Sequence, residues 1–189
     1  MPEYVYRQLA QDAVTAIIGV PGPRPESQRT EKPENDYALE FWDWDIEVER
    51  YVLNPQSFQS VRVRVFFAIS SSPDPTGPHS LLQVPSPRPG ERVLLLLDKW
   101  EPQNTHLEAN QFTIVGVHAY HAMGFTGFFE VDGENARIVK ANTSPPFTGP
   151  WQPLDQIVAA ITSPVPIPPA APTPTATVRP AATNTPCPT

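Results

Sequence analysis

Two stretches near the middle of the chain alternate apolar and charged side chains with a period of two. Residues 42–49 read Trp-Asp-Trp-Asp-Ile-Glu-Val-Glu, and residues 61–65 read Val-Arg-Val-Arg-Val. Successive side chains of a β-strand point to opposite faces, so each stretch predicts a strand with one buried and one solvated face. The charged face is acidic in the first and basic in the second. A hairpin turning at residues 54–57 would place these opposite charges side by side.

The apolar residues change parity just before the first stretch. Tyr37, Leu39 and Phe41 occupy odd positions, whereas Trp42 and Trp44 occupy even ones. A β-bulge adds one residue to a strand and reverses the two faces, which also bends strands at barrel corners. We therefore expect a bulge here. The alternative is that Phe41 lies exposed.

Further strands are expected between two short helices. The helices are expected at residues 4–12 and 151–161, the second with an apolar stripe. Residues 93–97 are apolar throughout, which favours a central strand covered on both faces. The remaining strands are expected at residues 13–20, 111–117, 124–131 and 136–139, with a tight turn at Asp132-Gly133.

Proline is unusually frequent, with 26 residues in the chain of 189, and from residue 164 onward Pro, Ala and Thr dominate. Such a segment cannot bury a core and favours an extended, disordered conformation. The sequence therefore predicts a β-domain over residues 1–163 and a Pro/Ala/Thr-rich extended tail over residues 164–189. Tails of this composition are typical of surface stalks, some of them glycosylated.

The net charge of −7 and the pI near 5.0 disfavour binding to nucleic acid. The only cysteine, Cys187, excludes an intramolecular disulfide. We expect no membrane-spanning segment, because no run of about 18 apolar residues occurs. Met1-Pro2-Glu3 does not resemble a secretion leader. The tail nevertheless favours an exported protein whose leader has been removed.

Catalytic, cofactor-binding and metal-binding residues are not expected. His118 and His121 would face opposite sides of an extended strand, since they are three residues apart. The acidic residues 43, 45, 47 and 49 would form a row with a spacing of about 7 Å rather than a cage. The sequence contains neither the phosphate-binding glycine motifs nor a nucleophile motif.

Two pairs of neighbouring phenylalanines suggest an interaction surface. Phe66-Phe67 and Phe128-Phe129 lie in predicted strands, so one ring of each pair points outward. A covering helix is the plain explanation, and a partner subunit is the alternative. Together with the thiol of Cys187, these four phenylalanines are the candidate interaction residues.

The order of features resembles secreted bacterial OB-like β-barrel proteins, which are loosely similar to the netrin and tissue-inhibitor-of-metalloproteinase module. The stretches that carry the resemblance are residues 13–20, Trp44 to Arg50, Val61-Arg62-Val63, Arg88 to Leu97 and Phe128 to Gly133. The resemblance implies a mainly β fold, an OB-like barrel of five to six strands with short N- and C-terminal helices, on the outside of the cell. Protease inhibition does not carry over, because the inhibitor branch depends on N-terminal and paired cysteines that this chain lacks.

We therefore expect a non-enzymatic extracellular or cell-envelope module for surface display, adhesion or assembly. Its expected partner is a second copy, as in a homopolymeric surface structure, or another cell-envelope component. The alternative is a carbohydrate- or peptide-binding domain that uses exposed aromatic side chains. An enzyme would instead need a pocket with convergent titratable groups.

Overall fold

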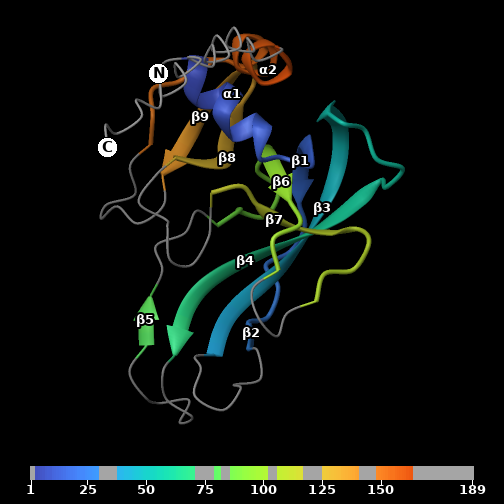
Figure 1. The fold of residues 1–189 in the computed structure, drawn as a ribbon, viewed down its shortest axis with the longest axis vertical. Coiled ribbons are helices and arrows are strands. Elements are labelled where there is room, and N and C mark those ends of the chain that lie inside the picture. The colour runs from blue at the N-terminus through green and yellow to red at the C-terminus, as the bar shows by residue number, and fades with distance from the viewer. Residues whose placement is uncertain are drawn as a thin grey trace, which may run out of the picture.

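The computed structural model describes residues 3–29, 38–70, 79–81, 86–101, 106–116, 125–140 and 148–163 (Figure 1). These residues form two helices and ten strands. The helices are α1 (Glu3–Gln11) and α2 (Leu154–Thr162). The strands are β1 (Thr15–Pro21), β2 (Gln28–Arg29), β3 (Ala38–Leu53), β4 (Ser60–Ser70), β5 (His79–Leu81), β6 (Val93–Asp98), β7 (Gln111–Ile114), β8 (Phe125–Asp132), β9 (Asn135–Lys140) and β10 (Gln152–Pro153).

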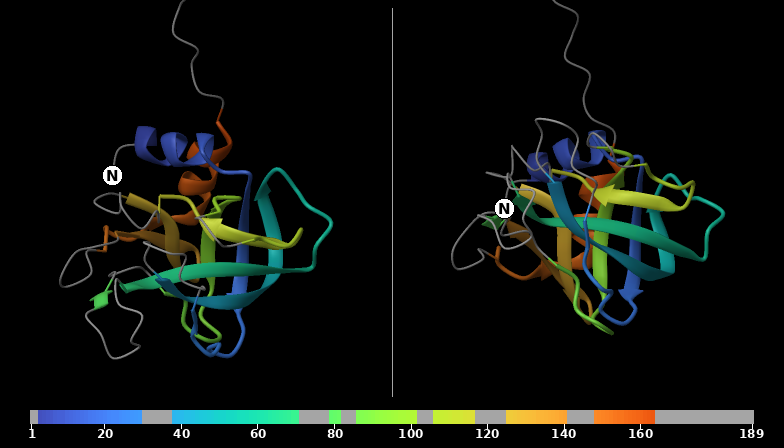
Figure 2. Two further views of the ribbon diagram at one scale, coloured as in Figure 1. Left: turned by 60° about the horizontal axis from the view of Figure 1, so that its bottom comes forward. Right: turned by 90° about the horizontal axis from the view of Figure 1, so that it is seen from below.

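Five strands close into a barrel. Their order is β1-β3-β4-β7-β6, and β6 pairs back with β1. Strands β4 and β7 run parallel, whereas the other neighbours in the barrel are antiparallel (Figure 2). Strands β8, β9 and β10 extend the sheet from β6. The expected mainly β fold with a barrel and two short helices is confirmed.

The β3–β4 hairpin has the register that the alternating pattern predicts. Asp43 lies opposite Arg64, and Asp45 lies opposite Arg62. On the other face, Trp44 is buried. A register shift lies between Glu40 and Phe41, but its extra residue is on β4, because Glu40 pairs with Ala68 and Phe41 with Phe66. From Phe41 to Glu47 the residues of β3 pair one to one, so the bulge expected in this strand at the parity change is wrong. Phe41 lies on the same face of β3 as Asp43, where Phe66 and the guanidinium of Arg64 cover its ring. The ring is only 5% exposed, so the alternative of an exposed Phe41 is also wrong.

The core lies on both faces of β6, as the apolar run predicted. Val93, Leu95 and Leu97 point into the barrel, while Leu94 and Leu96 point to the helices. The outer layer consists of α1 and α2, which pack against each other and cover the outer face of β1, β6 and β8 (Figure 1). The helices thus close one side of the barrel and place their outer surfaces in solvent.

The C-terminal helix begins later than expected. Gln152 and Pro153 pair with β9 as β10, and the helix starts at Leu154. Pro153 has a φ of −55° and a ψ of 129°, which is an extended conformation that suits the end of a strand. The predicted tail, residues 164–189, lies outside the described residues. Neither described helix has the length and apolar character that crossing a membrane requires.

Candidate functional site

The interior of the barrel is a packed core. Its buried side chains come from all five barrel strands, and they are joined by two residues of the β8–β9 extension. They are Ile17, Trp44, Ile46, Val61, Val63, Val65, Val93, Leu95, Leu97, Phe112, Ile114, Phe128 and Val139. Candidate binding surfaces among the described residues therefore lie on the outside of the barrel.

Three of the predicted interaction residues belong to the core. Phe66, Phe128 and Phe129 are 1%, 3% and 0% exposed. Phe128 points into the barrel, whereas Phe129 lies under α1 with its ring 5.6 Å from that of Tyr6. The expectation that these three rings form a surface is corrected accordingly. For Phe129, the covering helix is the explanation that holds.

Phe66 is buried in a separate aromatic cluster on the outer face of β4. Its ring makes edge contacts with Phe41 and Trp100, each at 5.7 Å between centroids. The guanidinium of Arg64 lies 4.1 Å above the ring of Phe41. The side chain of Phe67 and the whole of Cys187 lie outside the described residues.

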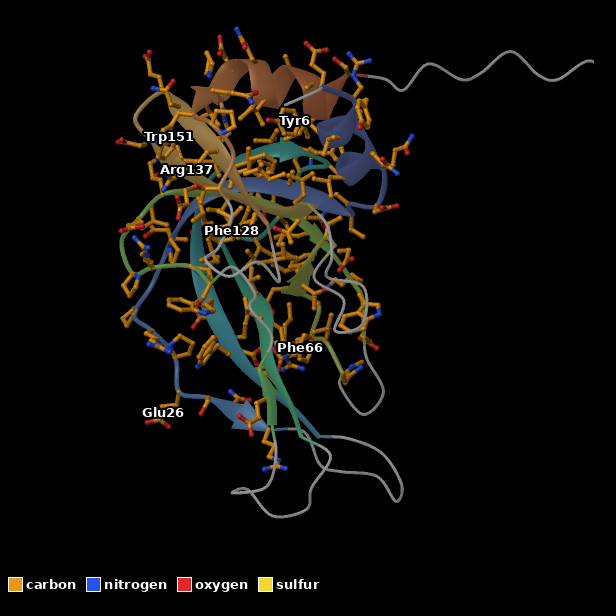
Figure 3. All side chains as sticks on the ribbon, turned by 90° about the vertical axis from the view of Figure 1, so that its left-hand side faces the viewer. Tyr6, Glu26, Phe66, Phe128, Arg137 and Trp151 are labelled. Carbon is orange, nitrogen blue, oxygen red and sulfur yellow. The ribbon has the colours of Figure 1, made fainter. Side chains whose placement is uncertain are left out.

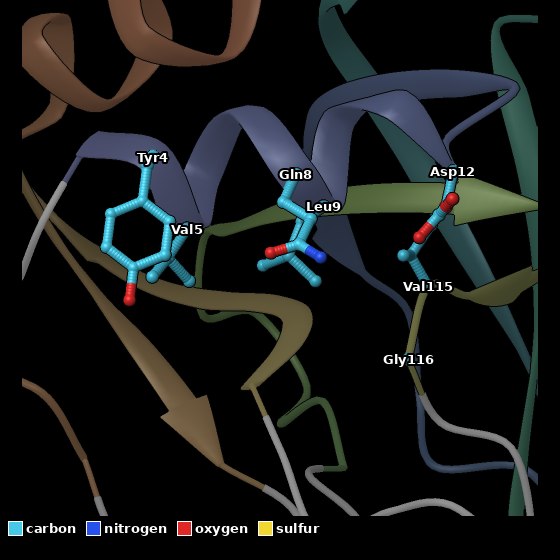
Figure 4. A pocket seen from close by; sticks show the side chains of 7 residues that line it. All are labelled: Tyr4, Val5, Gln8, Leu9, Asp12, Val115 and Gly116. Atoms are coloured by element: carbon cyan, nitrogen blue, oxygen red, sulfur yellow. The ribbon is translucent and has the colours of Figure 1, made fainter.

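A groove runs along α1 (Figure 4). Its volume is about 360 Å³, which is in the range of ligand-binding clefts. Val5 and Leu9 of α1, together with Val115 beyond the end of β7, supply apolar lining. The remaining lining residues are Tyr4, Gln8, Asp12 and Gly116. We call this feature the α1 groove.

One side of the α1 groove is formed by an aromatic and two polar side chains that helical spacing places in one row. Tyr4, Gln8 and Asp12 are four residues apart, so they follow one stripe of α1 and its C-terminal end. The Tyr4 side chain is 66% exposed. Among the described residues, Asp12 has no ion-pair partner. The groove therefore presents an aromatic ring at one end and a free carboxylate at the other.

A second exposed aromatic residue lies at the start of β10. Trp151 is 44% exposed, and the guanidinium of Arg137 lies 4.5 Å from its ring (Figure 3). Arg137 also pairs with Glu130 at 2.6 Å. One face of the indole is thus covered by a guanidinium that is itself paired with a carboxylate.

Lys99 is a basic residue with a structural role. Its ammonium donates to the carbonyl oxygens of Glu108, Ala109 and Gln111, and it lies 4.0 Å from the ring of Phe112. Burial lowers the pKa of the Lys99 ammonium. The three carbonyls use all three of its N–H donors, so this side chain fixes the turn before β7.

His106, a described histidine that lies outside the strands, is exposed. The side chain of His106 is 90% exposed, and its Nδ1 lies 3.6 Å from Glu101. Within the described ranges, no three side chains of His, Cys, Asp or Glu gather as metal ligands would. His118 and His121 lie outside those ranges.

Sequence reasoning did not identify the α1 groove. The helix itself was expected, at residues 4–12. The stripe of Tyr4, Gln8 and Asp12 along it was an available signal. The opposite wall comes from Val115 and Gly116, more than a hundred residues later, and its position depends on the pairing of β7.

Comparison with protein-family models, curated proteins and solved structures finds no match for this chain.

Proposed function

We propose that the protein is a non-enzymatic OB-like module of the extracellular space or cell envelope, serving display, adhesion or assembly. It does so by binding a segment of another polypeptide in the α1 groove. The observation that carries this proposal is the groove itself, with its apolar lining, the exposed ring of Tyr4 and the carboxylate of Asp12, which forms no ion pair with any described residue.

The barrel topology supports the OB-like part of the proposal. OB-folds are five-stranded Greek-key barrels. Here a five-stranded barrel includes the parallel pairing of β4 with β7, strands separated in sequence by β5 and β6. The proposed location is supported by the Pro/Thr composition of residues 164–189, which is typical of surface stalks. Protease treatment of intact cells tests the location, because a surface protein is cleaved while cytosolic markers survive.

The chemistry of the groove indicates the class of partner. Tyr4 and Asp12 are eight residues apart on a helix with a rise of 1.5 Å per residue, so about 12 Å separates them. A proline-rich extended segment packs well on exposed aromatic rings, and a cation would pair with Asp12. We therefore propose a partner segment that combines apolar or proline residues with one Arg or Lys.

A binding assay tests the proposal. The probe is a fluorescent ten-residue proline-rich peptide with one arginine, compared with a twin that carries glutamate instead. We expect the full chain to bind the arginine peptide, the glutamate twin to bind at least tenfold more weakly, and Tyr4→Ser to abolish binding. Trp151→Ser is the matched control, since it removes an exposed aromatic residue elsewhere. Equal binding by all variants would refute the groove as the site.

The assembly version has its own test. If the groove binds a second copy, light scattering of the full chain shows growth in mass with concentration, and Tyr4→Ser suppresses that growth. A monomer at every concentration, and in native extracts, would remove assembly and leave display or adhesion.

A second candidate function is carbohydrate binding at Trp151. It is favoured by the 44% exposure of the indole and by the neighbouring polar groups of Arg137 and Glu130. Sugar binding would change the tryptophan fluorescence of the wild type but not of Trp151→Ser. An unchanged spectrum across a glycan panel would eliminate this function.

A further inference from the structure

We infer that the α1 groove is filled in the resting protein by the segment of its own chain around Arg179. The inference rests on the proposed function, because it concerns the same groove, and it adds an internal competitor for the partner. The segment lies in residues 164–189, outside the described part of the chain.

The sequence of the segment has the composition that the groove favours. Prolines stand at positions 164, 166, 168, 169, 172, 174, 180, 186 and 188, and Arg179 is the only residue with a charged side chain after position 163. Proline-rich chains favour polyproline II, so they lose little conformational entropy on docking against aromatic side chains. The exposed Tyr4 ring supplies such a surface.

The charges are complementary as well. The whole chain carries a net charge of −7, which includes the positive charge of Arg179, so residues 1–163 carry −8. Asp12 lies at one end of the groove and has no ion-pair partner within the described residues. An arginine that meets a carboxylate forms a charge-assisted pair, and it also fixes the direction of the docked segment.

The segment can reach the groove. It follows α2, which ends at Thr162 and packs against α1, the helix that lines the groove (Figure 1). Arg179 is sixteen residues beyond Ser163, and a segment of this length extends up to about 50 Å in polyproline II. This exceeds the roughly 14 Å length of α1, a helix of nine residues.

Tethering favours the chain's own segment over that of a second copy. A flexible tether of this kind gives an effective concentration of about 1 mM, far above a micromolar protein concentration. A site with a Kd of about 100 µM would then be about 90% occupied within one molecule. The same site would be almost empty between molecules at micromolar concentration.

A spin-label experiment on the full chain tests the contact. Thr177→Cys combined with Cys187→Ser leaves one cysteine, two residues from Arg179, for a nitroxide. We expect the amide resonances of Gln8 to Asp12 to broaden, and Arg179→Glu to remove the broadening. Exchanging the charges, with Asp12→Lys and Arg179→Glu together, should restore it. Glu47→Gln, which neutralises an exposed carboxylate on β3, is the control and should change nothing.

The same experiment separates the possible sources of the segment. In a mixed sample, one copy of the chain carries the nitroxide. A second copy, without nitroxide, carries the isotope label, and its amide resonances are observed. We expect no broadening in this mixture. Broadening only in the mixture, or no broadening of α1 in either sample, would overturn the inference.

Peptide binding distinguishes this inference from the proposed function. If the tail competes, Arg179→Glu should increase the affinity of the arginine peptide about tenfold, by the ratio of 1 mM to 100 µM. An unchanged affinity would refute the internal competitor and leave the proposed function intact. No binding by either protein would instead count against the groove as a peptide site.

Discussion

Asp43 and Arg64 face each other across β3 and β4 and form a doubly hydrogen-bonded ion pair that is almost buried. Arg64 Nε and Nη2 each donate to a different oxygen of Asp43, both at 2.8 Å. The two side chains are 9% and 10% exposed. One register step away, Arg62 and Asp45 form the same kind of pair, but their side chains are 42% and 62% exposed.

We predict that breaking these two pairs has very different costs. Arg64→Met leaves a buried carboxylate without a partner, so the free energy of unfolding should fall by about 3–5 kcal/mol. Arg62→Met removes an exposed pair and should cost about 0–1 kcal/mol. Urea unfolding measures both. Equal losses in the free energy of unfolding would show that the burial of Arg64 and Asp43 does not increase the cost of breaking their ion pair.

The close approach of β1 and β3 gives a second prediction. A Cβ on Gly19 would touch the backbone oxygen of Glu47 and lie 2.8 Å from Cγ2 of Ile46. Gly19→Ala should therefore destabilise the protein by about 1–3 kcal/mol. At Gly22, just beyond the end of β1, the nearest atom would be Asp45 O at 3.4 Å, an ordinary contact. Gly22→Ala is the control, and thermal unfolding should show little change for it.

The burial of the Tyr6 phenol predicts that the free energy of unfolding falls at high pH. Burial raises the pKa of its phenol above the ordinary value of 10.0, against the smaller effect of its hydrogen bond to Gln152. The folded state therefore favours the protonated form, and the stability this gives is complete below pH 10 and lost as pH rises above it.

The measurement compares urea unfolding of the wild type and Tyr6→Phe between pH 7 and pH 11. At pH 7 the variant should be less stable by about 1 kcal/mol, because it lacks the hydrogen bond. Above pH 10 the difference should shrink, since only the wild type loses the contribution of the phenol. A difference that stays constant would contradict the assigned burial of the phenol.

The local pattern of the sequence was sufficient for the barrel strands. Trp44 and Val63 pair as their alternation predicts, and Leu94 and Leu95 face opposite layers because every residue of their run is apolar. These features depend on the two-residue period of a strand, which can be read without knowing the fold.

Features that depend on distant pairing could not be predicted from local pattern. Strands β2 and β10 have two residues each and exist because they meet β3 and β9. Phe129 reads as a surface candidate until α1 is placed over it. The α1 groove likewise depends on Val115 and Gly116 lying beside a helix from the start of the chain.

The central claim is that the α1 groove binds a polypeptide segment, and an NMR titration of the full chain with the proline-rich arginine peptide tests it most directly. We predict that the amide shifts concentrate at residues 4–12 and 115–116 and disappear in Tyr4→Ser. Shifts that centre on Trp151 and Arg137, or no shifts at all, would contradict it.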